Sequence, residues 1–221
     1  MTKFNTIIIP TTAIFAAALT SCENPADKTT EADVKDAVDV EEPSTDDAAS
    51  MTRYVISTDS TISFVGSKVT GSHDGGFKTF TGHFTTDENH EVNGGQIMID
   101  MSTTWADDDK LTKHLKSEDF FYIEEHPESH FTVTSVEKKD GNNYAISGNL
   151  KLRGVEKNIT FPATATTTDD GVKIDAEFDI DRTDWGIVYK GKADDLIRPE
   201  VVIKFDLTAS PAEDAAADMS S

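Results

Sequence analysis

The segment 171–181, Gly-Val-Lys-Ile-Asp-Ala-Glu-Phe-Asp-Ile-Asp, decides the fold class of this chain. Its apolar residues fall at every second position: Val172, Ile174, Ala176, Phe178 and Ile180. Side chains alternate between the two faces of a β-strand, so this pattern puts the apolar residues on one face and the charged residues on the other. The segment is therefore predicted to be a strand that covers a core on one side and meets water on the other.

The same alternation recurs along the chain on either side of this segment. Strands are predicted near 53–57, 60–69, 77–86, 94–102, 130–138, 143–153, 155–167, 171–181 and 201–209. Turn signals containing glycine lie at 74–76, 93–95, 140–143 and 169–171, so most neighbouring strands should form hairpins. An antiparallel sheet of about eight strands with one dry face can form a sandwich or close into a barrel, and periodicity alone does not choose.

One segment, 107–131, interrupts this β pattern. Three aspartates at 107–109 precede Leu111 and Leu115 at helical spacing, which predicts a short helix near 107–117. The aromatic run 120–122, Phe-Phe-Tyr, follows, and Pro127 prevents any further helix. We expect a plug or lid in which at least two of these aromatic side chains are buried.

Four motifs together resemble the YceI-like family of small bacterial envelope proteins. They are His114-Leu115 with Asp119-Phe120-Phe121, Pro127 and Phe131; Ser-Gly-Asn-Leu-Lys-Leu-Arg-Gly-Val-Glu-Lys at 147–157; Asp-Arg-Thr-Asp-Trp-Gly-Ile at 181–187; and Phe-Asp-Leu at 205–207. The likeness covers roughly residues 53–209. It implies an all-β fold, an antiparallel lipocalin-like barrel that holds a long apolar chain such as a polyisoprenoid, with no shared catalysis.

A barrel of this size can be packed solid or can hold one small ligand. Large and small residues are mixed on the expected inward faces, with Gly66, Gly82, Gly148, Ala163, Ala165 and Ala176 among the small ones. Native packing densities alone favour a filled interior, whereas the resemblance favours a hollow one. The candidate ligand-binding residues are Phe64, Phe80, Phe84, Phe120, Phe121, Phe131, Phe161, Phe178, Trp185 and Phe205. The alternative is a filled-barrel interaction or stress-related scaffold without a small-molecule ligand.

The N-terminus carries the signature of a bacterial lipoprotein. Lys3 precedes an apolar run from Ile7 to Leu19, and Leu-Thr-Ser-Cys at 19–22 matches a lipobox. This run is too short for a transmembrane helix and contains Pro10, while a cleaved signal without lipid is the other alternative. The sequence predicts a signal peptide at 1–21 and lipidation of Cys22, hence a membrane-anchored protein of the bacterial cell envelope, facing the periplasm or exposed at the surface.

Amino-acid composition predicts a disordered tether, one folded domain and a disordered tail in the rest of the chain. Residues 23–50 contain ten acids, two lysines and no aromatic residue, so segment 22–50 is predicted to be a disordered tether. A single domain is expected over 51–210, followed by a disordered tail at 211–221. The lone cysteine excludes an internal disulfide.

Charge narrows the possible partners. The chain has 41 acidic and 20 basic residues, which argues against a nucleic-acid partner. The domain 51–210 has 28 acids and 17 bases, and its field should repel a diphosphate unless Lys190, Lys192 and Arg198 mask it. Arg182 is expected to pair with Asp181 or Asp184 at the surface. These counts favour a neutral or weakly polar lipid, such as a quinone or a fatty-acid derivative.

Catalytic and metal sites lack a supporting pattern. His114, His126 and His130 could supply metal ligands together with the glutamates at 124, 125 and 128, but their spacing fits no tight zinc motif. The aspartates at 107–109 lack the frame of a calcium loop. No nucleophile motif or phosphate-binding loop occurs. The sequence therefore predicts a protein that is not an enzyme and needs no metal or cofactor.

Overall fold

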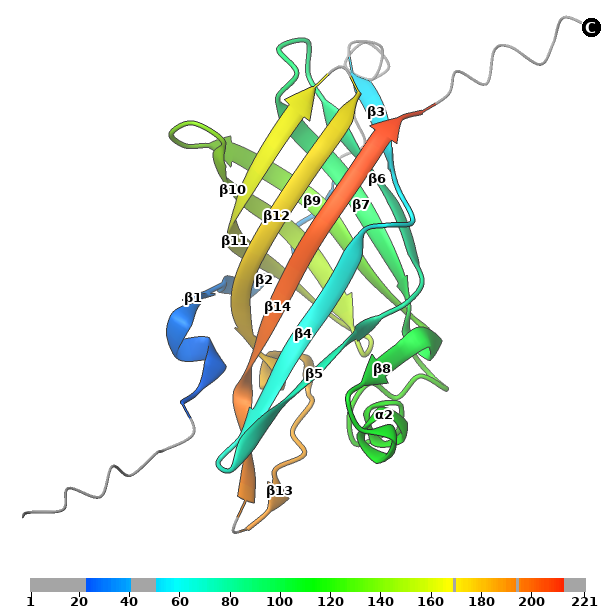
Figure 1. The fold of residues 1–221 in the computed structure, drawn as a ribbon, viewed down its shortest axis with the longest axis vertical. Coiled ribbons are helices and arrows are strands. Elements are labelled where there is room, and N and C mark those ends of the chain that lie inside the picture. Colours follow the sequence, from blue (N-terminus) through cyan, green and yellow to red (C-terminus); the bar gives the residue numbers. More distant parts are fainter. Residues whose placement is uncertain (1–22, 41–50, 169, 194, 213–221) are drawn as a thin grey trace, which may run out of the picture.

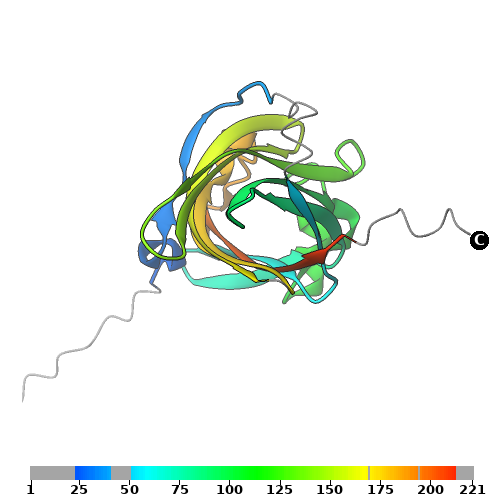
Figure 2. The ribbon, with the colours of Figure 1, turned by 90° about the horizontal axis from the view of Figure 1, so that it is seen from above.

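The structure is a computed structural model that describes residues 23–40 and 51–212 apart from positions 169 and 194. Its main body is a closed antiparallel β-barrel of eight strands, which form a ring when viewed along the barrel (Figures 1 and 2). The barrel strands are β3 (Thr52–Ile56), β6 (Phe80–Thr86), β7 (Val92–Asp100), β9 (Glu128–Lys138), β10 (Asn143–Leu152), β11 (Val155–Thr168), β12 (Gly171–Asp181) and β14 (Asp195–Pro211). The predicted barrel is thus confirmed.

Closure depends on the long strand β14. Along one edge β14 pairs with β12 from Glu200 to Ala209, and along the other it pairs first with β4 (Thr61–Lys68) and then, at residues 209–211, with β3. The strands follow the order β12-β11-β10-β9-β7-β6-β3-β14 and return to β12. Because every strand of this ring has two neighbours, the ring is closed, as a barrel requires and a sandwich does not.

Shorter elements extend one end of the barrel, the lower end in Figure 1. They comprise β4, β5 (Gly71–Phe77), η2 (Met101–Thr103), β8 (Thr104–Ala106), α2 (Asp109–Leu115), η3 (Arg182–Trp185) and β13 (Gly191–Lys192). The helix predicted near 107–117 is confirmed as α2. The Asp108 carboxylate accepts hydrogen bonds from the amides of Lys110 and Leu111, which caps the helix at its N-terminus.

The predicted turn at 74–76 is wrong, because these residues lie inside strand β5. A Cβ added to Gly75 would collide with the ring of Phe64, and one added to Gly76 would lie 2.7 Å from the Ile62 carbonyl. The glycines are therefore needed because side chain and backbone approach closely there, which is one of the standard roles of glycine within strands.

The expected disordered tether is wrong for residues 23–40, while 41–50 lie outside the described residues. After η1 (Pro25–Lys28), β1 (Thr30–Glu31) pairs in parallel with β12, and β2 (Asp33–Asp36) pairs antiparallel with β11. We call residues 24–38 the N-terminal strap. It lies on the outer side of the ring, against β11 and β12 (Figure 2).

The strap is ordered because it fills a gap in the barrel wall. Strands β11 and β12 pair with each other only between residues 164–168 and 171–175, and beyond this stretch their facing edges part. Unpaired strand edges favour the addition of another strand. The Ala32 amide donates to the Asp179 carbonyl at 2.8 Å, and the small Ala32 side chain is buried in the core. Long-range pairing thus outweighs an acidic local composition.

The predicted signal peptide (1–21), tether (22–50) and C-terminal tail (211–221) extend beyond the residues that the structure describes. Residues 1–22, including Cys22, and 213–221 are outside the described part, and β14 runs to Pro211 at its C-terminal end. Within residues 23–40 and 51–212, no helix is long and apolar enough to cross a membrane.

Candidate lipid-binding cavity

An apolar cavity of about 330 Å³ lies inside the barrel toward its lower end. On one side of the cavity lies a densely packed region, to which most barrel strands contribute buried residues. On the other side lies a lid, built by α2 and the segment that follows it. The residues that line the cavity are Ile62, Phe64, Gly66, Ser67, Lys68, His73, Phe77, Ile97, Ile99, Leu111, Leu115, Phe120, Phe121, Ser129, Phe131, Leu150, Leu152, Ile159, Phe178, Ile180, Arg182, Ile187, Ile197, Arg198, Val201, Ile203 and Phe205. Of the two alternatives, a hollow barrel and a filled one, the structure shows the hollow barrel.

Aromatic rings form the floor of the cavity. Phe178 and Phe161 stack with ring centroids 4.1 Å apart, and Phe205 meets both rings edge-on. Phe131 contacts Phe161 from the other side at 5.7 Å. Phe161 does not line the cavity itself but supports the three rings that do. Since aromatic pairs in these geometries are favourable, the floor is a stiff apolar surface.

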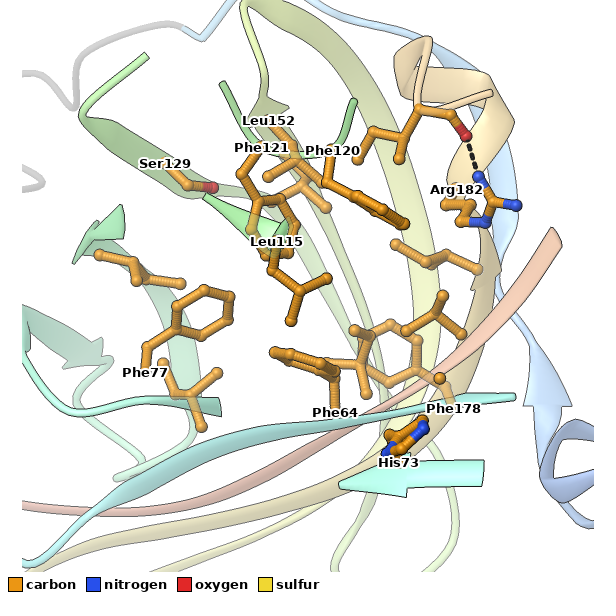
Figure 3. Close-up of a pocket in the computed structure, with 18 of the residues that line it drawn as sticks. Phe64, His73, Phe77, Leu115, Phe120, Phe121, Ser129, Leu152, Phe178 and Arg182 are labelled. Atoms are coloured by element: carbon orange, nitrogen blue, oxygen red, sulfur yellow. Dashed lines mark hydrogen bonds between the residues drawn. The ribbon is translucent and has the colours of Figure 1, made fainter. Parts of the chain in front are cut away.

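A second cluster forms the lid. Leu115, Phe120 and Ile187 form one buried cluster with Phe64, and Figure 3 shows Leu115 and Phe120 above Phe64. The prediction that at least two of residues 120–122 are buried is wrong in detail. Phe120 is buried with 6% of its surface exposed, whereas Phe121 and Tyr122 are half-buried. Phe121 is only half-buried because its ring borders the cavity rather than solid core.

The motif at 181–187 builds one side of the cavity mouth. Asp181 accepts a hydrogen bond from the Thr183 amide and starts η3, and Trp185 is fully buried with its indole nitrogen donating to the Leu150 carbonyl at 3.1 Å. Gly186 has φ +71°, which lets the chain turn sharply so that Ile187 enters the lid cluster.

Arg182 is not the surface ion pair that the sequence suggested. It is 6% exposed and donates hydrogen bonds to the backbone carbonyls of Ile187, Tyr189, Ile197 and Arg198 (Figure 3). Burial lowers the pKa of Arg182, and the Asp181 carboxylate opposes this shift. A guanidinium keeps its charge even so. Arg182 therefore holds segment 187–198 in place and brings a positive charge to the cavity wall.

The polar part of the cavity wall is basic. Lys68, His73, Arg182 and Arg198 line it, and none of the described residues that line the cavity is acidic. Lys68 pairs with Asp195 at 2.5 Å, and His73 contacts Asp107 at 2.8 Å, both acids standing outside the lining. Reasoning from the sequence missed Lys68 and His73, because neither stands in a motif. Lys68 lies at the end of an alternating strand and His73 near the start of the next one, and this position was the only available signal.

Six of the ten predicted ligand-binding residues line the cavity: Phe64, Phe120, Phe121, Phe131, Phe178 and Phe205. The other four do not. Phe84 and Phe161 are buried in the packed region, Phe80 packs against its border, and Trp185, the last residue of η3, is buried in the packed region as well. The three phenylalanines lie on strands at heights where the barrel is solid, whereas Trp185 lies on η3, to which strand alternation does not apply. Contact with a ligand stays a prediction for the six.

The histidines considered as metal ligands lie apart. His114 pairs with Asp119 at 2.8 Å, His130 with Glu128 at 3.2 Å, and His126 packs edge-on against Tyr122. In the part of the chain that the structure describes, no three His, Cys, Asp or Glu side chains gather into a possible metal site.

The hairpin between β10 and β11 explains the motif at 147–157. Arg153 and Gly154 have φ +51° and +77°, the arrangement that a two-residue hairpin turn requires. His126 packs directly on Gly154, and Arg153 donates to the Glu118 carbonyl at 2.9 Å. The turn thus fastens the lid segment to the barrel.

Comparison with known families agrees with this architecture. The model of the YceI-like domain matches residues 54–209. The chain belongs to the YceI-like family. Its curated relatives include Protein YceI of Escherichia coli O157:H7, 41% identical over 91 residues, and a UPF0312 protein of Photorhabdus laumondii, 40% identical over 90 residues. These matches cover 40% of this chain and 47% and 46% of the relatives, so the chain spans about half the length of the curated relatives that it matches.

Solved structures share the YceI-like fold. BcnA of Burkholderia cenocepacia superposes with a TM-score of 0.62 at 23% identity, covering 68% of this chain and 96% of BcnA. A polyisoprenoid-binding domain from Saccharophagus degradans, implicated in plant cell wall breakdown, superposes with a TM-score of 0.60 at 17% identity, covering 73% and 99%. At such identities the likeness establishes the barrel fold.

Proposed function

We propose that this YceI-like protein binds one long-chain lipid in its barrel cavity and acts as a carrier or store in the bacterial envelope, without catalysis. The observation that carries the proposal is the apolar cavity of about 330 Å³ between aromatic floor and lid. Its size lies within the range of small-molecule sites. The polyisoprenoid-binding domain of Saccharophagus degradans has the same fold, which supports a polyisoprenoid or similar chain as ligand.

The walls supply enough free energy for a lipid with few polar contacts. Burial of each methylene contributes about 0.8 kcal/mol, so a ten-carbon stretch gains about 8 kcal/mol before the costs of ordering are subtracted. A filled barrel acting as a scaffold would offer no such gain. The cavity therefore favours the carrier over the scaffold.

The lining also revises the expected headgroup. The domain as a whole is acidic, but the charged residues that line the cavity are basic: Lys68, Arg182 and Arg198, with His73 beside them. In a site of low dielectric, the nearest charges outweigh distant ones. We propose a headgroup that is anionic or a strong hydrogen-bond acceptor, such as a phosphate or carboxylate, rather than the neutral one that net charge suggested.

Attachment to the membrane is the second part of the proposal. The lipobox at 19–22 supports processing at Cys22 and a thioether-linked lipid there, which would hold the barrel at an envelope membrane. Replacing Cys22→Ser should release the protein from the membrane fraction. Full retention of the variant would disprove the anchor.

Lipid binding is tested by native mass spectrometry of the purified full chain. We expect a co-purified lipid with wild type and its loss in Gly66→Trp, because Gly66 lines the cavity and a Cβ there meets nothing within 4 Å. Gly71→Trp is the matched control, since Gly71 also has open space but does not line the cavity. A clean apo mass in repeated wild-type preparations would support the scaffold instead.

A further inference from the structure

The rim of the cavity mouth exposes four large apolar side chains. Val69, Val188, Tyr189 and Leu196 have 54%, 61%, 36% and 47% of their surfaces exposed. They come from three separate segments: the β4–β5 turn, the loop after η3 and the β13–β14 hairpin. We call these four residues the apolar rim.

Hydrogen bonds join the three segments of the apolar rim. The Val69 amide donates to the Leu196 carbonyl at 3.2 Å, and the Ile197 amide donates to the Lys190 carbonyl at 3.0 Å. The buried Arg182 guanidinium holds the Tyr189 carbonyl at 2.8 Å. The ring of Tyr189 also packs 5.4 Å from the ring of Phe120 in the lid. The exposed side chains are thus presented by a fixed framework.

Such a group is unusual for a surface in water. Scattered exposed apolar residues are normal, and Val55 and Met98 on the barrel wall are of this kind. Exposed apolar residues grouped at one end and bordered by charge mark an interaction surface. The apolar rim is grouped in this way.

The charged residues beside the apolar rim indicate which kind of surface the rim can bind. Lys190 and Lys192 stand exposed beside the apolar rim, and the Asp195 carboxylate is paired with Lys68. The domain otherwise has an excess of eleven acidic residues over 51–210. Aliphatic and tyrosine side chains flanked by lysine are the composition of protein surfaces that enter the headgroup layer of anionic membranes.

The apolar rim is continuous with the cavity. Ile187 and Ile197, adjacent to rim residues in sequence, line the cavity, and so do Lys68 and Arg198. Figure 1 places β13 and the β4–β5 turn together at the lower end of the barrel. A surface seated on the apolar rim therefore lies against the open end of the lipid site.

The N-terminal strap begins at the same end. Ser67, two residues before Val69, donates to the Asn24 side chain at 3.3 Å. Two residues of chain, at most about 7 Å, separate Asn24 from the proposed anchor at Cys22. A lipid on that cysteine would leave the barrel close to the apolar rim and not at the opposite end.

We propose that the apolar rim docks onto the surface of an anionic phospholipid bilayer, so that the cavity opens directly toward the membrane. The inference rests on the proposed lipid-binding function and adds the route: the chain passes between bilayer and cavity across the rim without crossing water. Two independent observations carry it, the composition of the rim and the position of the strap.

An environment-sensitive dye tests the docking surface. It is attached in the full chain to Val188→Cys on the rim or to Val55→Cys on the opposite wall, both in a Cys22→Ser background so that only one thiol reacts. On adding vesicles of phosphatidylethanolamine and phosphatidylglycerol, dye emission should rise and shift to shorter wavelength at 188 and stay constant at 55. Both positions are exposed valines, with 61% of the surface of Val188 and 46% of that of Val55 exposed.

The charge requirement is tested in the same assay. Lys190→Glu and Lys192→Glu should each raise the vesicle concentration at half-maximal signal by at least about fivefold, since one lysine contributes about 1 kcal/mol near an anionic surface. Equal responses at 188 and 55, or none at 188, would overturn the proposal. A response at 188 that grows with protein concentration without vesicles would identify a second copy as the occupant and equally overturn it.

Failure of docking and failure of lipid binding can be told apart. Gly66→Trp should lose the co-purified lipid and keep the vesicle response at position 188, because Gly66 lies inside the cavity. Lys190→Glu with Lys192→Glu should weaken the vesicle response and keep the lipid, because neither lysine lines the cavity. If the two responses are always lost together, the rim is not a separate surface.

Discussion

The N-terminal strap should detach locally when Asn149 is replaced. Asn149 is buried in the outer face of β10, where its side chain pairs with the backbone of Val38: its amide donates to the Val38 carbonyl at 2.7 Å, and its oxygen accepts from the Val38 amide at 3.2 Å. Asn149→Leu keeps the number and branching of the side-chain heavy atoms and removes both bonds to the strap. At a net 0.5–1.5 kcal/mol each, the strap should lose about 1–3 kcal/mol.

Hydrogen exchange measures this loss directly. When exchange follows local opening, each 1.4 kcal/mol accelerates it about tenfold, so amides of residues 30–38 should exchange about five to 150 times faster. The barrel itself should change little, because Asn158, which also donates to Asn149, keeps its bond to the Thr134 hydroxyl at 3.0 Å. The control is Asn142→Leu, whose exposed side chain donates a hydrogen bond to the Thr166 hydroxyl at 3.2 Å, away from the strap.

Two results would refute this account of the strap. Unchanged exchange at 30–38 would mean that the Asn149 contacts do not hold it. An equal acceleration throughout the barrel would mean that strap and barrel unfold as one unit. The outcome matters for the cavity, because β2 pairs with Ile159 and β1 with Phe178, and both of these residues line it.

Three further predictions concern the cavity and its rim. Ala176→Phe should lower thermal stability by about 1–3 kcal/mol, because Ala176 is buried in the core cluster and does not line the lipid cavity. Gly66→Phe instead enters the cavity and should leave melting nearly unchanged while displacing lipid. Phe120→Ala should cost about 3–5 kcal/mol in denaturant unfolding, and a wild-type value would show the lid to be dispensable. The hydrogen bond from Lys68 holds the pKa of Asp195 below its ordinary value, so this clamp is complete above about pH 4 and is lost as pH falls through the lowered pKa. Protection factors at 69–71, which correct for the intrinsic pH dependence of exchange, should fall with that loss in wild type and stay constant over the same pH range in Asp195→Asn.

The barrel strands and the helix could be predicted because their signals are local. Alternation along 171–181 specifies a strand without reference to any partner, and Asp108 caps α2 within three residues. The N-terminal strap could not be predicted in the same way. Its residues Thr30–Asp36 are acidic and mostly exposed, and their partners lie more than 100 positions away on β11 and β12. The open edges that recruit the strap exist only after the barrel forms.

Net charge is a poor guide to the charge around the proposed headgroup, for a related reason. Counting charges over 51–210 treats the domain as one average field, but folding separates the charges. Glu177 on strand β12, for example, faces water and pairs with Lys204 at 2.9 Å. The basic residues Arg182 and Arg198 instead turn toward the cavity. The local sign of the site is therefore opposite to the sign of the domain.

Two inward glycines explain why the sequence could not distinguish a hollow barrel from a filled one. Gly148 and Gly66 both interrupt alternating strands, but the Phe131 ring occupies the space of a Cβ at Gly148, whereas nothing lies within 4 Å of one at Gly66. The difference comes from the neighbours. Gly148 is surrounded by long barrel strands, while Gly66 pairs with His73 and Val201 where the sheet widens toward the mouth. An inward-facing glycine thus leaves a cavity only where no side chain from a neighbouring strand fills the space beside it. Whether a neighbouring side chain fills that space depends on the height of the glycine along the barrel axis, and not on which strand carries the glycine.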